Sequence, residues 1–183
     1  MDPPTHDSPY DLLLDTAVQA ARRAAAVIQE QAGRPGGVRD KSRNDFVTDA
    51  DERAQAVIVE SLRETFPRDA ILAEEGAAGD GEAPVVSGRR WIVDPIDGTT
   101  NFMHQVPPYA VSIALQEEDE IVVGVVLDVP RDELFTAVAG HGLQVNGEEE
   151  GVSATDAFGE AFLATGFPYR RFEHTDRYLD VLA

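Results

Sequence analysis

Two aspartates three positions apart, Asp94 and Asp97, are the residues of this chain best suited to chemistry. They follow an apolar stretch within the segment Trp91-Ile92-Val93-Asp94-Pro95-Ile96-Asp97-Gly98-Thr99-Thr100-Asn101-Phe102. Carboxylate oxygens are the ligands that a hard cation such as Mg²⁺ prefers. Gly98 lets the backbone turn tightly and approach a ligand. The N–H groups of this glycine and of the two threonines after it would then face an anion, as at a helix start. A metal and a phosphate in one turn indicate phosphoryl chemistry.

Three further acids lie at the ends of expected elements. Asp51 is placed at a helix start, and Glu74 and Glu75 follow a short apolar strand. Because strand ends commonly line crevices, these acids are expected to converge with the two aspartates. Clustered carboxylates repel one another unless a divalent cation lies between them. The clustering therefore predicts a metal site, most simply two Mg²⁺ ions that bridge a phosphate and a water.

Each of these features also has a plainer interpretation. Asp51 alone is typical of a helix cap, and Glu74-Glu75 alone is typical of a solvated strand end. A β-turn would explain the proline and Gly98 of the first segment. It would not explain two acids followed by Thr99 and Thr100, so this segment favours the functional interpretation.

The basic and imidazole side chains give weaker signals. Lys41 and Arg43 precede the second expected helix, where they would either meet a phosphate or simply be exposed. The histidines show no spacing typical of metal ligands and are interpreted as surface or turn residues: they are His6, His104, His141 and His174.

The chain is strongly acidic, which bears on its partners. It has 34 acidic and 15 basic residues, a net charge of -19. Nucleic acids and anionic lipids bind through cationic contacts, so neither is expected as a partner. The surface is either a solvated coat that maintains solubility or an adaptation to a halophilic cytoplasm, where salt screens self-repulsion. In the second case, activity would rise with KCl into the molar range.

The remaining composition argues for a globular protein in the cytoplasm. Hydrophobic residues make up 43% of the chain, enough for a core. The chain has no cysteine, so disulfides and thiolate chemistry are excluded and a reducing cytoplasm is compatible. No apolar run reaches about 18 residues, so no membrane span is expected.

Two amphipathic helices followed by strands predict an α+β fold with the helices packed on an antiparallel sheet. The first helix is expected over residues 8–31, capped by Asp7 or Ser8 with Pro9 in its first turn. The second follows Thr48-Asp49-Ala50-Asp51, which resembles a capping box. Residues 76–88 are expected to be a loop, and a helix is expected from residue 177. Strands are expected at 71–73, 91–94, 111–116, 121–127, 133–139 and 161–165.

These motifs resemble the inositol monophosphatase family of Mg²⁺-dependent, lithium-sensitive phosphatases. The resemblance rests on residues 45–51, on Ala73-Glu74-Glu75 and on residues 91–102. It extends to residues 164–169 and so covers almost the whole chain. It implies a layered αβαβα sugar-phosphatase-like fold. Residues 1–150 would form a metal- and phosphate-binding domain, and residues 151–183 would begin a second, incomplete α/β domain.

The resemblance also implies a set of metal ligands. A complete site would hold two or three Mg²⁺ ions, and Glu75 would lie just outside the ligands. These ligands would be three carboxylates and one main-chain carbonyl, from Glu74, Asp94, Asp97 and Ile96 respectively.

The remaining roles follow from the same resemblance. Gly98 and Thr99 would donate backbone N–H groups to the phosphate. Asp51 with Thr99 would orient a metal-bound water, and Glu74 would help to deprotonate it.

The resemblance points to a substrate class and to a partner. Residues 103–107 and 165–168 look most like the branch that hydrolyses myo-inositol monophosphate to inositol and phosphate. Other branches hydrolyse fructose 1,6-bisphosphate, 3′-phosphoadenosine 5′-phosphate or histidinol phosphate. A non-catalytic metal- or phosphate-binding module remains an alternative. The resemblance also implies a homodimer.

Family members continue beyond the length of this chain, as the resemblance implies. That region carries a Trp-Asp-x-Ala-Ala-Gly motif whose aspartate binds the second metal, and the motif does not occur before Ala183. The chain is therefore expected to be a fragment of a longer enzyme. Alternatively, it is a genuine short form that works as a dimer or is not a phosphatase.

Overall fold

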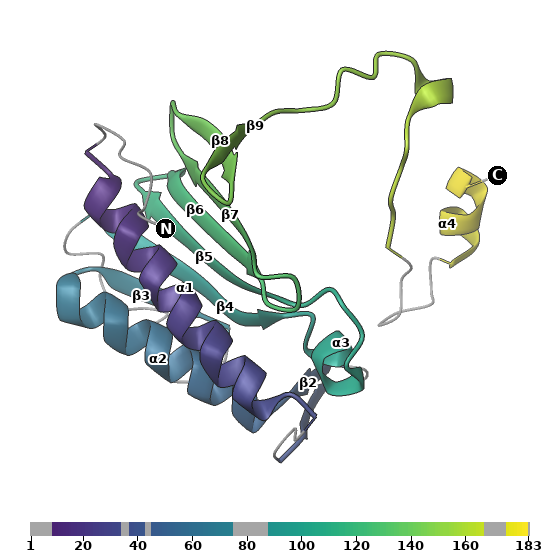
Figure 1. Ribbon diagram of the computed structural model, residues 1–183. Coiled ribbons are helices and arrows are strands. Elements are labelled where there is room, and N and C mark those ends of the chain that lie inside the picture. The colour runs from purple at the N-terminus through teal and green to yellow at the C-terminus, as the bar shows by residue number, and fades with distance from the viewer. Residues whose placement is uncertain (1–8, 34–36, 43–44, 75–87, 167–174, 183) are drawn as a thin grey trace.

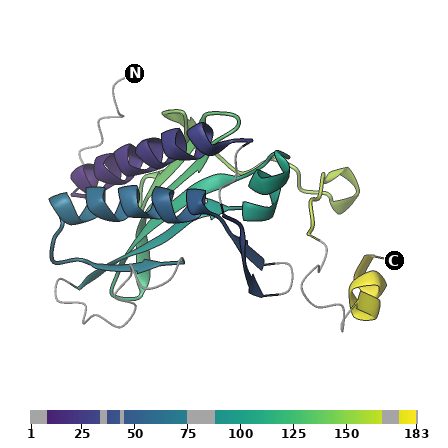
Figure 2. The same ribbon diagram turned by 90° about the horizontal axis from the view of Figure 1, so that it is seen from below.

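The computed structural model describes residues 9–33, 37–42, 45–74, 88–166 and 175–182. Two long helices lie on one face of a twisted seven-stranded sheet (Figures 1 and 2). The expected α+β fold, with both N-terminal helices on the sheet, is confirmed. In chain order the elements are α1 (Asp11–Gln31), β1 (Arg39–Ser42), β2 (Asp45–Val47), α2 (Asp49–Thr65), β3 (Ala70–Ala73), β4 (Arg89–Asp97), α3 (Thr99–His104), β5 (Ala110–Glu117), β6 (Glu120–Asp128), β7 (Glu133–Val138), β8 (Gly142–Val145), β9 (Glu148–Glu150), the 3₁₀ turn η2 (Phe158–Glu160) and α4 (Thr175–Leu182).

The helix α1 packs through a stripe of small and aliphatic side chains. Leu14, Ala17 and Ile28 are among its fully buried residues. Their spacing of three and four positions places them on one face, and the small alanines allow close approach to α2 and the sheet. The predicted caps Asp7 and Ser8 lie outside the described residues. The cap position is Tyr10, whose side chain makes no capping hydrogen bond, so Pro9 precedes the helix instead of occupying its first turn.

The sheet has the order β3-β4-β5-β6-β7-β8-β9, and one pair departs from the expected antiparallel arrangement. Strands β3 and β4 are parallel, with Ile71 opposite Trp91. The segment that connects them is long enough to return the chain to the same end of the sheet, which a tight hairpin cannot do. The other pairs are antiparallel, and the predicted hairpin between residues 111–116 and 121–127 is confirmed as β5–β6.

The first residue of β4 takes part in a buried polar cluster, which we call the Asp69 cluster (Asp69, Arg89, Trp91 and Phe66). Asp69 Oδ1 accepts hydrogen bonds from Nε and a terminal nitrogen of Arg89 at 3.2 and 3.0 Å. Its Oδ2 accepts from Trp91 Nε1 at 3.1 Å. The guanidinium of Arg89 also lies 5.3 Å from the ring centroid of Phe66. The cluster fixes the start of β4, whose far end carries Asp94 and Asp97.

The chain after β9 leaves the sheet (Figure 1). The strand predicted at residues 161–165 is wrong, because residues 161–166 have no regular structure. A strand needs a hydrogen-bonded neighbour, and the described residues offer none there. The helix predicted from residue 177 is confirmed as α4, which begins at Thr175. The loop predicted at 76–88 lies outside the described residues, except for Gly88. Among the described helices, none has the length and apolar character to cross a membrane.

Candidate metal and phosphate site

The strand β4 ends in an irregular segment that carries the candidate ligands. Asp94 is opposite Ser112 of β5, and the regular register is lost before it resumes with Asp97 opposite Ala110. Pro95 lies within this break, where a residue without an N–H group costs no ladder hydrogen bond. Ile96 between them is buried, while Asp97 is exposed. The break thus anchors the segment through an apolar side chain and leaves Asp97 facing outward.

Glu74 and Asp94 come together at the adjacent ends of β3 and β4. Glu74 is held by its N–H group, which donates to the carbonyl of Val93 at 3.0 Å. The pKa of Asp94 is raised to about 7, first by burial and then by the charge of Glu74 and by a hydrogen bond between the two carboxyl groups. The charge of Asp97 raises it further, while the N–H of Ile96 lowers it. The negative charges of Glu74 and Asp97 thus disfavour the ionised form of Asp94.

Asp51 and Thr99 form a second pair, although 48 positions separate them in the chain. Asp51 is fully buried in the first turn of α2. Its Oδ2 accepts hydrogen bonds from the N–H and the hydroxyl of Thr48 at 2.9 and 2.5 Å. The N–H of Asp51 donates to the Thr48 hydroxyl oxygen at 3.4 Å, and this bond together with the one from the Thr48 N–H forms the predicted capping box. Burial raises the pKa of the Asp51 carboxyl, and these hydrogen bonds oppose the shift. Oδ1 of the same carboxylate lies 3.1 Å from the hydroxyl of Thr99.

The hydroxyl of Thr99 joins the two pairs. Its oxygen is 3.1 Å from Asp51 Oδ1 and also 3.1 Å from the carbonyl oxygen of Ile96. A threonine hydroxyl has one proton, so it donates to one of these acceptors at a time. Donation to the Asp51 carboxylate is the stronger, charge-assisted choice. It leaves the lone pairs of the Ile96 carbonyl available to another partner.

Gly98 provides the turn from β4 into α3. Its φ of 95° is in the left-handed region, which glycine adopts without steric cost. A Cβ added there would lie 3.2 Å from the carbonyl oxygen of Pro108, so the position is also crowded. The first N–H groups of a helix have no partner within it. In α3 these groups include the N–H groups of Thr99 and Thr100, which together with that of Gly98 are the donors that the sequence predicts for a phosphate.

Among the described residues, no group of three or more histidine, aspartate or glutamate side chains is arranged closely enough to hold a metal ion as it stands. The structure joins Glu74 with Asp94 and places the charge of Asp97 nearby, but Asp51 belongs to the separate Thr99 pair. Glu75 and Arg43 lie outside the described residues, as does the side chain of Lys41. The predicted site is thus seen as two linked pairs.

Comparison with known proteins identifies the group to which the chain belongs. The model of the inositol monophosphatase family matches residues 10–180. The chain belongs to the inositol monophosphatase family. It is 40% identical over 173 residues to the Nus factor SuhB of Escherichia coli K12, which covers 93% of this chain. The crystal structure of the extragenic suppressor protein SuhB from Bartonella henselae superposes with a TM-score of 0.84, at 37% identity over 92% of this chain and 64% of that one. An IMPase from Thermotoga maritima gives 0.70, at 36% identity over 78% of this chain and 54% of that one.

This member of the family spans 63% of the length of its Escherichia coli relative. The match covers both pairs of site residues, since both lie within residues 10–180. Because the chain spans only this part of its relative, the match does not by itself establish the activity, substrates or partners of the whole protein.

The donor set of this family member suits a divalent cation by its chemistry, although the acids are not gathered into one cluster among the described residues. Glu74, Asp94 and Asp97 carry oxygen donors of the kind that Mg²⁺ prefers, and the Ile96 carbonyl would add a neutral one. The raised pKa of Asp94 is the observation that favours a cation, because a positive charge there would relieve the repulsion that raises it. Thr48 is the one site residue that the sequence assigned only a capping role. Its signal was the capping box itself, which brings its N–H and hydroxyl to Asp51.

Proposed function

We propose that this chain carries the metal- and phosphate-binding half of a Mg²⁺-dependent phosphomonoesterase that hydrolyses myo-inositol monophosphate. The observation that carries the proposal is the arrangement at the end of β4. There, the carboxylates of Glu74 and Asp94 repel each other, and the Thr99 hydroxyl, which lies 3.1 Å from the Ile96 carbonyl of the same segment, is paired with the buried Asp51. Membership of the family supports the reaction class.

In this proposal, one set of residues binds the metal and the phosphate, and a second set orients the attacking water. Glu74, Asp94, Asp97 and the Ile96 carbonyl would hold Mg²⁺, which when bound supplies charge neutralisation for the phosphate and acidifies water. The N–H groups at the start of α3 would donate to the phosphate oxygens.

The Asp51–Thr99 pair would orient the attacking water. Asp51 is ionised at neutral pH only if its hydrogen bonds offset its burial, and Thr48 supplies two of them. The Asp51 carboxylate would hold the Thr99 hydroxyl in one orientation, so that the Thr99 oxygen accepts a hydrogen bond from water. Glu74 would take the proton that the water loses. Phosphoryl transfer depends mainly on such positioning and on electrostatics.

The Thr99 hydroxyl is the group whose removal tests this arrangement most cleanly. Thr99→Val keeps the shape and removes the hydroxyl, so turnover should fall about 100-fold, the size of effect typical of a lost proton-transfer or orienting group. Thr99→Ser keeps the hydroxyl and should retain most of the activity. The measurement is Mg²⁺-dependent release of phosphate from inositol 1-phosphate. It should use this chain and also the longer product if the gene continues beyond Ala183. Equal activity of the valine variant and the native protein would refute the role of Thr99.

The substrate is tested in the same assay. Fructose 1,6-bisphosphate and 3′-phosphoadenosine 5′-phosphate should give lower kcat/KM than inositol 1-phosphate. A higher value for either would move the protein to that branch of the family. Lithium inhibition, a homodimer and a halophilic surface remain predictions that accompany the proposed function.

A second candidate function is a module that acts through partner contacts. The observation in its favour is the name of the Escherichia coli relative, which is that of a Nus factor. This candidate would gain support if no substrate were turned over and Asp94→Asn left partner binding unchanged.

A further inference from the structure

The β1–β2 hairpin is a separate two-stranded sheet that does not join the main sheet. Its register slips between Asp40 and Ser42, which weakens the pairing. An isolated two-stranded hairpin is at best marginally stable in water. Its position must therefore depend on contacts with the rest of the protein.

The hairpin lies beside the candidate site. Strand β2 contacts α3, the helix that begins with Thr99, and Figure 2 shows the hairpin below α3 at the end of α2. Strand β2 also leads directly into Thr48 and the capping box that holds Asp51. Val47, the last residue of β2, is buried. Strand β2 is thus held by the burial of Val47 and by its direct connection to α2.

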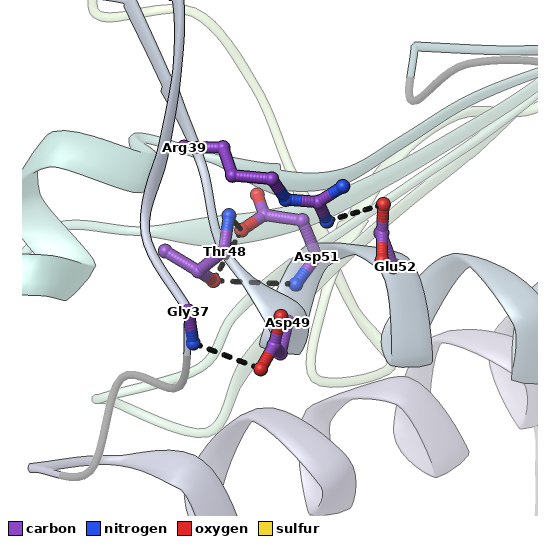
Figure 3. Close-up of polar contacts among 6 residues, drawn as sticks. All are labelled: Gly37, Arg39, Thr48, Asp49, Asp51 and Glu52. Atoms are coloured by element: carbon purple, nitrogen blue, oxygen red, sulfur yellow. Dashed lines mark hydrogen bonds and ion pairs between the residues drawn. The ribbon is translucent and has the colours of Figure 1, made fainter.

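Two acidic side chains in the first turn of α2 contact the start of β1 and the segment just before it (Figure 3). Oδ2 of Asp49 accepts a hydrogen bond from the N–H of Gly37 at 2.8 Å. Glu52 forms an ion pair with Arg39 at 2.5 Å. We call these two contacts the hairpin latch. Both acids lie one position from the capping box residues Thr48 and Asp51, so the latch and the box share a single helical turn.

The two contacts of the latch differ in strength. The side chains of Arg39 and Glu52 are 55% and 53% exposed, so their ion pair is screened by water and salt. The Asp49 contact is also exposed to solvent, but it is a charge-assisted hydrogen bond to a backbone N–H and does not require a long side chain to be ordered. Asp49 should therefore contribute most of the attachment of the hairpin to α2, and Glu52 should add to that attachment at low ionic strength.

We propose that Asp49 and Glu52 are positioning residues that hold strand β1 against α2 and so fix the hairpin beside the Asp51–Thr99 pair. This inference rests on the proposed function only where it concerns activity. The hairpin latch itself does not depend on the proposed function, because it concerns only which backbone segments are held together.

Amide hydrogen exchange, read by mass spectrometry, tests the latch without any assay of activity. In the double variant Asp49→Ala/Glu52→Gln, exchange of residues 37–42 should become about tenfold faster, the effect of losing one hydrogen bond to a charged group. Exchange of residues 99–104 should also rise. Asp49→Asn retains an acceptor oxygen for the Gly37 N–H and should restore most of the protection.

The matched control is Glu60→Gln. Glu60 is an exposed acid on the same helix, paired with Arg23 at 3.7 Å, and its substitution removes one negative charge, as Glu52→Gln alone does. It should leave exchange at residues 37–42 unchanged. Unchanged exchange in the double variant would overturn the latch.

Activity then separates a positioning role from a merely structural one. The double variant should raise KM for inositol 1-phosphate several-fold more than it lowers kcat, with the thermal midpoint close to that of the Glu60→Gln control. Faster exchange at 37–42 with unchanged exchange at 99–104 and an unchanged KM would refute positioning of the site. If the native protein shows no turnover, the proposed function fails, and exchange at residues 37–42 and 99–104 still decides the latch.

Discussion

Replacing Asp94 by asparagine is expected to make the metal-free protein more stable and to remove its stabilisation by Mg²⁺. The raised pKa of Asp94 reports repulsion from Glu74 and Asp97, and an uncharged amide removes that repulsion. The amide oxygen can still accept the hydrogen bond from the N–H of Ile96, which is 3.1 Å from Asp94 Oδ1. After allowance for solvent screening, we expect a gain of about 1 kcal/mol.

The stabilisation by Mg²⁺ should be lost in the Asp94→Asn variant. A ligand at 100 times its Kd stabilises the native state by about 2.7 kcal/mol. For a chain of this size that is a rise of about 5–10 °C in Tm. Thermal unfolding with EDTA and with saturating Mg²⁺ measures both effects. The native protein should gain under Mg²⁺, and the Asp94→Asn variant should not. A variant that is less stable in EDTA and still gains with Mg²⁺ would contradict this role of Asp94.

The gain in stability from Asp94→Asn should depend on pH, because folding raises the pKa of Asp94. A carboxyl whose pKa rises on folding from 3.8 to about 7 favours the folded state fully at a pH below 3.8. That contribution is lost as the pH rises through 7. In EDTA, the advantage of the Asp94→Asn variant over the native protein should therefore be largest at pH 8 and smaller at pH 5.

Asp69→Ala is expected to be the most destabilising single change considered, with a loss of about 3–5 kcal/mol, the range for breaking a buried ion pair. The side chain of Asp69 is 1% exposed and that of Arg89 is 29% exposed. The substitution removes the acceptor for Trp91 Nε1 and the carboxylate that binds Arg89. Because whole domains are stable by only about 5–15 kcal/mol, this is a large fraction of the total.

Urea unfolding of Asp69→Ala beside Asp132→Asn, which suits the left-handed backbone at residue 132, measures this effect. Asp132 forms an exposed ion pair with Arg22 at 3.5 Å, with side chains 76% and 53% exposed, so its loss should cost less than about 1 kcal/mol. Similar midpoints for the two variants would show that the Asp69 cluster does not anchor β4.

Local signals predicted much of the fold. Four consecutive residues predict the Thr48 capping box, and two neighbouring apolar runs predict the β5–β6 hairpin. The parallel pairing of β3 with β4 was not predictable, because strand direction depends on contacts distant in sequence. The β1–β2 hairpin was missed because β1 consists of polar residues and β2 is only three residues long. The predicted strand at 161–165 failed for the opposite reason: a suitable local pattern has no partner strand among the described residues.

Part of the candidate site was likewise predictable from local sequence, and part depends on contacts between residues distant in the chain. Asp94, Asp97 and Gly98 were identified from one short segment, because a strand end, two acids and a turn are adjacent there. The contact between Asp51 and Thr99 spans 48 positions, and no local pattern encodes it. Only the resemblance to a family linked them. The sharing of the Thr99 hydroxyl between Asp51 and the Ile96 carbonyl required coordinates.

Calorimetric titration of the metal-free chain with Mg²⁺ tests the central claim most directly, since it asks whether the end of β4 binds a metal and needs no substrate. The native chain should bind at least one Mg²⁺ per molecule. Asp94→Asn should abolish this binding, and the distant control Glu60→Gln should leave it unchanged. The absence of binding by the native chain, or the same affinity in the Asp94→Asn variant, would contradict the account.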